Sequence, residues 1–439
     1  LEPFSLVFST GSKLDSLGCQ GRLTNAFSGE PVKDALVMLY RDDIDSLPKS
    51  TLPRYFARTN EAGQYEIQNV KSGNYKLFAL KDQNSNYLYD QPGELIGFPE
   101  HLISIDSAKT PIPEIRLSAE VASDQRLVKS EFEEPGMVTL KYSIAPDTVY
   151  FTDFSGNSLQ FFLTEESKRD SLNFLFKRFE GDSVKLFAHS YLGGQGRVDT
   201  LEFRAKKVKP LGRKGSRNTA KDTSLAFSSS IEAKKLLPSE KLILKSNYPC
   251  QLSDSANFNW IIAGDTTVAA LPVSLSPFNF EFIPPSAESK AIYLIGASGS
   301  FIDIYGHSSD TIKTDFRVME EDETGNLEIL VFDSTNTDKV VILELTDSKG
   351  AVKFKKSISG NDSLLIRNLR PGTLKLRAIV DANSNGKWDP ANYNLKTQPE
   401  LVYRYSEEIT IRAGWDLAVE WDIFARPVQK KRPDKPASE

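Results

Sequence analysis

The sequence predicts an all-β protein, an elongated tandem array of β-sandwich modules. Helix signals are almost absent, because no segment of about 12 residues has apolar positions at the helical spacing i, i+3, i+4, i+7. Short runs rich in β-branched and aromatic residues recur instead, for example at 75–80, 138–142 and 327–332. Turn-forming residues separate these runs, as in Ser348-Lys349-Gly350. Many short strands spaced by such turns are typical of β-sandwiches.

Length and composition narrow the class of protein. A chain of 439 residues has room for about three to five domains. With 39% hydrophobic and 26% charged residues, the composition is that of a folded globular protein. The net charge of −5 argues against nucleic-acid binding as the main function. Cys19 and Cys250 are the only cysteines, and we expect two separate thiols rather than a disulfide framework.

An internal repeat is the most informative feature of the sequence. Residues 69–90 (NVKSGNYKLFALKDQNSNYLYD) align without a gap with residues 368–389 (NLRPGTLKLRAIVDANSNGKWD), at an offset of 299 residues. Each copy has a glycine turn, a strand and then the pattern D-x-N-x-N-x-x-x-D. An offset this large is not the period of a solenoid. We therefore expect one module that is used twice, once near each end of the chain.

The segments before and within the first copy carry a family resemblance. Residues 21–40 (GRLTNAFSGEPVKDALVMLY) and 57–80 (ARTNEAGQYEIQNVKSGNYKLFAL) resemble the carboxypeptidase-regulatory-like, or transthyretin-like, β-sandwich. The order of modules resembles that of Ig-like-domain surface lipoproteins of the Bacteroidota. The resemblance extends over essentially the full chain and is closest at 16–118. It implies a lipid-anchored protein of the outer membrane, at the cell surface or facing the periplasm.

We divide the chain into seven segments. They are the closing strand of a truncated Ig-like domain (1–15), a carboxypeptidase-regulatory-like sandwich (16–118), an Ig-like β domain (119–208), a polar basic linker (209–235), a second Ig-like β domain (236–322), a second transthyretin-like sandwich (323–426) and a disordered tail (427–439). Because the chain opens inside a strand-like run, we expect the true N-terminus and the lipid anchor to lie outside it.

The sequence offers no recognisable catalytic constellation. Its three histidines, His101, His189 and His307, fall in three different expected modules and in no metal-binding or triad pattern. The glycine and serine residues at 296–300 miss the spacing of a nucleophile elbow. We therefore predict that the protein is not an enzyme. A catalytic part in a missing N-terminal region is kept as a competing hypothesis.

The repeated acidic-amide loops are the candidate metal sites. They place Asp and Asn at loop positions 1, 3, 5 and 9, the spacing by which an EF-hand arranges oxygen ligands around Ca²⁺. The candidate ligands are Asp82, Asn84, Asn86 and Asp90 in the first loop and Asp381, Asn383, Asn385 and Asp389 in the second. Neither loop has Glu at position 12, although Glu94 could substitute in the first. The alternative is a structural turn in which these side chains cap their own backbone without an ion.

The predicted function is that of a non-enzymatic surface lipoprotein that acts through protein–protein contacts. The resemblance implies an accessory subunit of an outer-membrane protein assembly or export complex, with a β-barrel membrane protein as partner and no nucleic acid. The alternative is a glycan-binding or nutrient-uptake accessory protein. For that role Trp388, Trp415 and Trp421 could form an aromatic platform, unless they pack in the core. The basic stretch at 206–217 is interpreted as a solvated linker.

Overall fold

The computed structural model describes residues 15–425, except 92, 121–124, 134–135, 165–170, 178–182, 205–223, 239, 263–265, 286–290 and 335–338. Within these residues the only helices are α1 (Leu47–Ser50) and the 3₁₀ turn η1 (Glu321–Glu323). The predicted all-β array of sandwiches is confirmed. None of the described helices has the length and apolar character needed to cross a bilayer. The closing strand predicted at 1–15 (apart from Asp15), the basic stretch and the tail lie outside the described residues.

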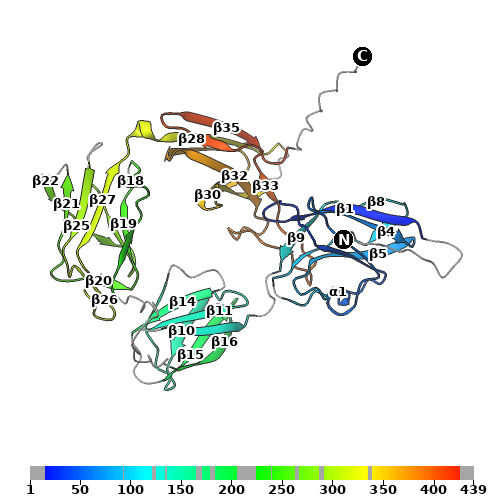
Figure 1. Ribbon diagram of the computed structural model, residues 1–439, viewed down its shortest axis with the longest axis horizontal. Coiled ribbons are helices and arrows are strands. Elements are labelled where there is room, and N and C mark those ends of the chain that lie inside the picture. The colour runs from blue at the N-terminus through cyan, green and yellow to red at the C-terminus, as the bar shows by residue number, and fades with distance from the viewer. Residues whose placement is uncertain are drawn as a thin grey trace, which may run out of the picture.

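Four β-sandwich modules follow one another along the chain (Figure 1). We name them module 1 (15–120), module 2 (125–204), module 3 (224–319) and module 4 (320–425). Each module has its own cluster of buried apolar side chains. The modules therefore have separate cores, as expected for domains of this size.

Module 1 is a nine-stranded sheet folded over into two layers. In chain order its strands are β1 (Leu17–Asn25), β2 (Leu36–Tyr40), β3 (Tyr55–Arg58), β4 (Gln64–Val70), β5 (Gly73–Lys81), β6 (Leu95–Gly97), β7 (Ile103–Ile105), β8 (Thr110–Pro111) and β9 (Ile115–Ala119). One layer has the order β4-β1-β9, with β1 parallel to β9, and the other contains β3-β2-β5 with β6 and β7.

Strand β2 and residues 77–80 of β5 are buried on both faces, which explains their uninterrupted apolar sequences. In β2, Val37 and Leu39 face the core between the layers. The alternate residues Leu36 and Met38 face a second apolar cluster on the outside of the sheet. Module 1 thus has an outer apolar face that something must cover.

Module 4 repeats the topology of module 1. Its strands are β28 (Gly325–Phe332), β29 (Val340–Asp347), β30 (Val352–Ser359), β31 (Asp362–Leu369), β32 (Gly372–Val380), β33 (Val402–Arg404), β34 (Ile409–Ile411) and β35 (Asp416–Asp422). The orders β31-β28-β35 and β30-β29-β32 match β4-β1-β9 and β3-β2-β5, and β28 is parallel to β35. Left-handed residues recur at the same offset, with φ of 57° at Asn69 and 56° at Asn368. The sequence repeat is therefore a structural repeat.

Module 2 has seven strands in two sheets, β10-β11-β14-β13 and β12-β15-β16. They are β10 (Leu127–Glu133), β11 (Met137–Tyr142), β12 (Thr148–Thr152), β13 (Phe161–Leu163), β14 (Ser171–Phe176), β15 (Ser183–Leu192) and β16 (Gln195–Arg204). This four-plus-three order is that of a constant-type immunoglobulin domain. Phe151 lies at its centre, with ring centroids 4.9 Å from those of Phe174 and Phe176.

Module 3 is also a sandwich, with main sheets β17-β19-β24-β23 and β18-β27-β25-β21-β22. Its strands are β17 (Phe227–Ser229), β18 (Lys235–Leu236), β19 (Leu242–Ser246), β20 (Cys250–Leu252), β21 (Phe258–Ile262), β22 (Thr266–Ala269), β23 (Val273–Ser274), β24 (Asn279–Phe282), β25 (Ala291–Gly296), β26 (Phe301–Asp303) and β27 (Ile312–Val318). The linker predicted at 209–235 is too long, because Leu225 is buried in this core and β17 and β18 join its two sheets.

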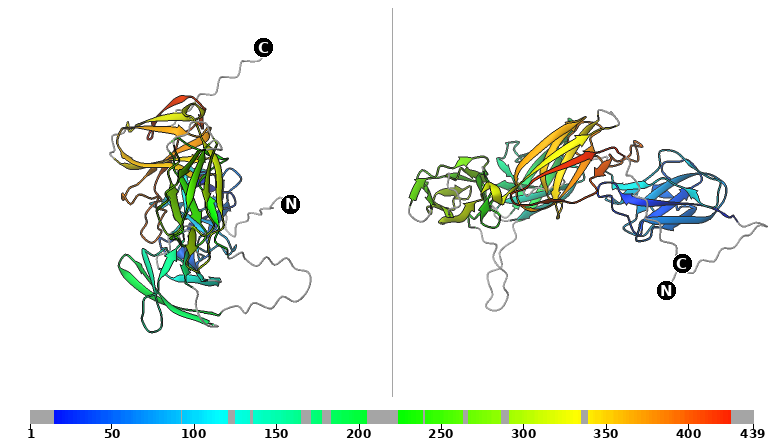
Figure 2. Two further views of the ribbon diagram at one scale, coloured as in Figure 1. Left: turned by 90° about the vertical axis from the view of Figure 1, so that its left-hand side faces the viewer. Right: turned by 90° about the horizontal axis from the view of Figure 1, so that it is seen from above.

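Contacts between the modules close the tandem array on itself. Tyr305 of module 3 donates a hydrogen bond to the Phe176 carbonyl of module 2 at 2.9 Å, and Arg370 of module 4 donates to the Lys235 carbonyl at 3.0 Å. Module 4 then contacts module 1 through the segment around Tyr393. The four modules consequently form a closed circuit (Figures 1 and 2). The physical reason is the outer apolar face of module 1, which module 4 helps to cover.

Candidate functional site: the paired acidic loops and the junction of modules 1 and 4

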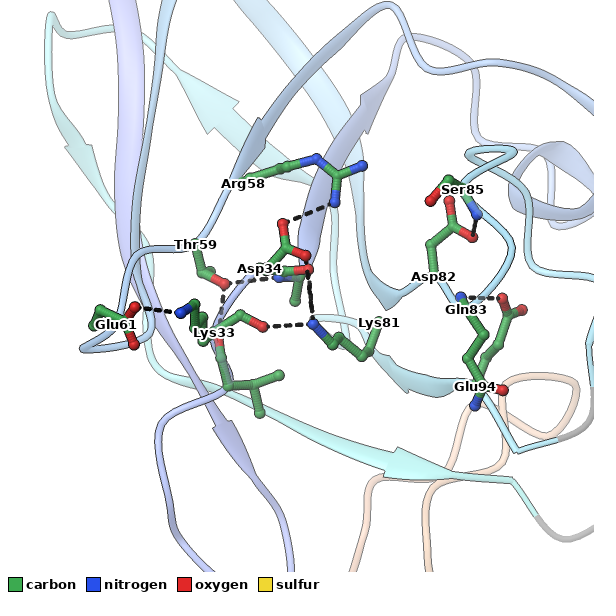
Figure 3. A network of polar contacts seen from close by, with 12 residues as sticks. Lys33, Asp34, Arg58, Thr59, Glu61, Lys81, Asp82, Gln83, Ser85 and Glu94 are labelled. Carbon is green, nitrogen blue, oxygen red and sulfur yellow. Dashed lines mark hydrogen bonds and ion pairs between the residues drawn. The ribbon is translucent and has the colours of Figure 1, made fainter. Parts of the chain in front are cut away.

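The first acidic loop begins at the end of β5, where a polar network fixes Lys81 (Figure 3). The Lys81 ammonium donates to the Lys33 carbonyl at 2.8 Å and to the Asp34 carbonyl at 3.1 Å. The Asp34 carboxylate lies 3.7 Å from Lys81 and accepts a hydrogen bond from Arg58 at 3.0 Å. The residue before the loop is therefore held to the neighbouring end of β2.

The Asp and Asn side chains of the first loop converge on one another. The Asp82 carboxylate accepts backbone N–H groups of Asn84, Ser85 and Tyr87 at 3.1, 2.7 and 2.8 Å. The Asp90 carboxylate accepts the side-chain amides of Asn84 at 3.1 Å and Asn86 at 2.7 Å. These are the contacts by which Asx side chains stabilise a tight turn.

The second loop makes a similar set of contacts, although Asp381 accepts fewer N–H groups than Asp82 does. The Asp381 carboxylate accepts the N–H groups of Asn385 at 2.9 Å and Gly386 at 2.8 Å. The Asp389 carboxylate accepts the amides of Asn383 and Asn385, each at 2.6 Å. Ser85 and Ser384 share left-handed φ values of 61° and 57°. The two loops thus adopt one conformation, as the identical spacing predicts.

A glutamate closes each loop, and in the second loop the sequence reasoning missed it. Glu94, which is fully buried, accepts the N–H groups of Gln83 at 3.0 Å and Asp90 at 3.3 Å. Glu400 takes the equivalent N–H groups, of Ala382 at 2.8 Å and Asp389 at 2.9 Å. Glu94 lies four positions after Asp90, whereas Glu400 lies eleven positions after Asp389. The equivalence is visible only in the structure, because the gap-free alignment ends at Asp389.

The structure leaves the Ca²⁺ hypothesis as a prediction. Among the described residues no three His, Cys, Asp or Glu side chains are grouped as they would be to hold a metal, so an ion would need the Asn oxygens as well. The carboxylates already accept N–H groups, as the structural-turn interpretation requires. Burial raises the pKa of Glu400, and the negative charges of Asp389 and Asp381 raise it further, whereas the backbone hydrogen bonds lower it. A bound cation would relieve that repulsion.

The segment between Asp389 and Glu400, which we name the docking loop (residues 389–400), reaches module 1. Tyr393 is 1% exposed and packs in the outer apolar cluster of module 1, with ring centroids 4.9 Å from Phe78 and 5.1 Å from Phe98. The buried Ala391 N–H donates to the Ser118 hydroxyl at 2.9 Å. The Tyr393 N–H donates to the Glu120 carboxylate, which also accepts the Tyr89 hydroxyl.

Charged groups surround this apolar contact. Lys396 lies 3.6 Å from the centre of the Tyr393 ring, and its ammonium is 2.7 Å from the Asp45 carboxylate of module 1. Asp45 also pairs with Lys76, which is nearly buried and lies 3.0 Å from Asp43. The hydrogen bonds from Lys396 and Lys76 lower the pKa of Asp45 to about 2.

A second contact joins the same two modules around Phe27. The Trp388 ring lies 5.0 Å from the Phe27 ring, and the Arg377 guanidinium lies 4.5 Å from its centre. Arg404 donates to the Phe27 carbonyl. The predicted aromatic platform is therefore not a single surface, because Trp388 is in this junction, Trp421 is in the module 4 core and Trp415 is 57% exposed.

The histidines have no common site. His189 Nε2 is 3.0 Å from the Thr152 hydroxyl in module 2, and His307 Nδ1 is 2.9 Å from Asp303 in module 3. His101 lies at the surface of module 1. Each histidine thus has a local environment of its own.

Comparisons with known proteins provide no family assignment. No family model matches the chain, and no curated protein matches it. Solved structures align over most of its length, among them the major pilin subunit BcpA of Bacillus cereus at 10% identity (92% of this chain, 99% of that chain, TM-score 0.16). Others are the four N-terminal Ig domains of Dscam1 at 12% identity (88% and 95%, TM-score 0.17) and the BSP domain of a biofilm-associated protein at 9% identity (97% and 99%, TM-score 0.19). Scores this low support no argument about the function of this chain.

Proposed function

We propose that this chain is a non-enzymatic protein of the cell surface or outer membrane that works through protein–protein contacts. On this proposal it is an accessory subunit of an outer-membrane protein assembly or export complex, and its partner is a β-barrel membrane protein. The closed circuit supports the proposal, because it fixes loops and sheet edges of four modules in one arrangement. Several modest contacts held in this way add up to a strong interface.

An uncharged apolar edge of module 3 is the observation that carries the proposal. Among the described pairings, β22 pairs with β21 alone and β23 with β24 alone, so both are edge strands. Segment 266–279 contains no charged residue. Within it Leu271 is 83% exposed, and Val273 and Leu275 are exposed as well. Edge strands usually have charges that prevent pairing with other chains, so this edge is suited to an added strand or an apolar partner surface.

Purification of the full-length protein from gently solubilised membranes tests the proposal. We expect a β-barrel protein to co-purify, and the double variant Leu271→Lys, Val273→Lys to reduce its recovery. Leu52→Lys is the matched control, since Leu52 is also exposed but lies in module 1. Recovery of a protein that is alone and monomeric would contradict the proposal.

The glycan alternative has one observation in its favour, a row of three stacked rings on module 2, of which Tyr150 is exposed and His189 and Tyr191 are half-buried. Tyr150 stacks on His189, with ring centroids 4.4 Å apart and planes at 4°, and the Tyr191 ring follows at 6.0 Å and 18°. The two tyrosine hydroxyls lie 3.4 Å apart. Aromatic rings with polar tips can stack on a sugar while bonding to its hydroxyls.

Binding of a purified polysaccharide separates the two functions. Micromolar binding that Tyr150→Ala abolishes and Tyr150→Phe retains would establish the glycan function in place of the protein partner. Absence of binding, together with co-purification of a β-barrel, would leave the first proposal standing.

A further inference from the structure

The docking loop is preformed by its own hydrogen bonds. At its base the Glu400 N–H donates to the Asp389 carbonyl at 3.0 Å, next to the contact between the Asp389 N–H and the Glu400 carboxylate. Further out, Asn392 and Thr397 exchange two backbone hydrogen bonds of 3.0 Å. A loop closed in this way loses little conformational entropy when it docks.

The surface of module 1 that the loop covers is apolar. Met38 and Phe78 are fully buried, and Phe98 is 5% exposed, all in the cluster that Tyr393 and Ala391 complete. Leu47, Tyr87 and Tyr89 of module 1 cover other parts of the same cluster. Removal of Tyr393 would therefore expose part of a contiguous apolar patch, which soluble monomers rarely display.

Modules 1 and 4 are held together only by non-covalent contacts, since two whole modules separate them in the sequence. Each of the other junctions of the circuit joins modules that are neighbours in the chain. The tether through modules 2 and 3 raises the effective concentration of module 4 near module 1, so that a small interface is sufficient. Module 4 can therefore leave module 1 without the unfolding of either module, because their cores are separate.

We propose that the docking loop holds module 4 against module 1 and so closes the four-module circuit. Tyr393 is its apolar anchor, and the Lys396–Asp45 pair fixes its orientation. Release of the loop opens the circuit and uncovers the outer apolar face of module 1. The contact around Phe27 aligns the two modules but does not hold them without Tyr393. This inference does not depend on the proposed function.

A zero-length carbodiimide cross-link tests the docked state in the full chain. It requires an ion pair in contact, and Lys396 and Asp45 are 2.7 Å apart. We expect mass spectrometry to find the 396–45 cross-link in the monomer, beside a control cross-link between Lys241 and Glu281, which are 2.7 Å apart within module 3. Finding only the control cross-link would overturn the proposal.

Tyr393→Ala should reduce the 396–45 cross-link at least about tenfold, because truncating a buried aromatic side chain costs more than the free energy of one decade. The radius of gyration from small-angle X-ray scattering should increase at the same time. Tyr393→Phe keeps the ring and should stay closed. Leu395→Ala is the control within the loop, since Leu395 is 72% exposed.

Circular dichroism separates opening from unfolding, because an opened circuit keeps its strand signal. A Tyr393→Ala protein that keeps both the cross-link and the compact radius would show that the Phe27 contact is sufficient, and would refute the role of the docking loop. A Leu395→Ala protein that opens would refute the assignment of Tyr393 as anchor.

Discussion

Modules 1 and 4 are two copies of one fold with loops of different length. Module 1 has a long segment with α1 between β2 and β3, where module 4 has a short turn between β29 and β30. Module 4 has the longer loop between its last Asp and the closing Glu. In module 1 Glu94 lies four positions after Asp90, and in module 4 Glu400 lies eleven positions after Asp389. The acidic turn before this point is the same in both copies. Contacts among its Asp, Asn and Glu residues fix the start of the loop in both modules, and the loop that follows is longer in module 4. The acidic turn is common to both copies, whereas the longer loop of module 4 contacts module 1.

Replacing residues 390–399 with the short segment 91–93 removes this difference and should have the largest effect. Module 4 should still fold, because its core cluster contains no residue of this segment. Module 1 should lose the cover of Tyr393, at a cost of about 3–5 kcal/mol to the docked state. Increased binding of a hydrophobic dye, with unchanged circular dichroism, is the expected result. Dye binding equal to that of the wild type would show that the loop covers nothing essential.

The Asp at the start of each loop provides a sharper comparison of the two copies. Asp381 is 3% exposed, whereas Asp82 is half-buried. Asp381→Ala removes the acceptor of the Gly386 N–H and leaves the Asn385 N–H with only the Asn383 side-chain oxygen at 3.2 Å. We therefore expect it to destabilise module 4 by about 1–3 kcal/mol. Asp82→Ala should destabilise module 1 less. Urea unfolding of the two variants measures both effects, and a larger loss for Asp82→Ala would contradict this ranking.

Calcium tests whether the shared loop geometry also holds an ion. If both loops bind Ca²⁺, the ion should raise the free energy of unfolding by about 1.4 kcal/mol per loop at ten times its Kd, because it binds only the folded state. Melting in millimolar Ca²⁺ and in chelator is the measurement. The double variant Asn84→Ala, Asn383→Ala should abolish the difference. Identical melting in Ca²⁺ and in chelator would leave only the structural turn.

The pH dependence of the junction should be the smallest effect. The pKa of Asp45 is lowered to about 2 from an ordinary value near 4. Its contribution to the stability of the folded chain, from its pairs with Lys396 and Lys76, is therefore present above pH ~4 and is lost as the pH falls towards about 2. Because the Asp45 side chain is 64% exposed, solvent screens the pair and the effect is modest. Asp45→Asn should lower the melting temperature slightly at pH 6 and not at pH 2. An equal decrease in melting temperature at pH 6 and pH 2 would mean that the charge of Asp45 does not contribute to stability.

The sequence was sufficient for features that depend on local chemistry. Strand patterning predicted the all-β array, and the 69–90 and 368–389 alignment predicted two modules with the same turn. The Asx spacing predicted which side chains converge, since those contacts span fewer than ten residues. These features can be predicted from the sequence, because the separation of two residues in the chain determines whether they can form a hydrogen bond within a turn.

Long-range contacts were not readable in the same way. Glu400 was missed because a longer loop moves it away from the aligned pattern. The start of module 3 was missed because the polar residues around Leu225 resemble a linker. Closure was missed because strand β2 and residues 77–80 of β5, buried on both faces, do not show in their sequence what covers the outer face. A comparison of segments 91–94 and 390–400 would have identified the inserted loop but not its contact.

A distance measurement across the junction tests closure most directly. Spin labels on cysteines at the exposed positions Leu52 of module 1 and Leu365 of module 4 would report it by pulsed electron paramagnetic resonance. The native Cys19 and Cys250 are buried, and burial raises the pKa of each thiol to about 11, so neither should react with the label. We predict one narrow distance distribution that Tyr393→Ala makes broad. A broad distribution in the wild-type chain would contradict the closed circuit.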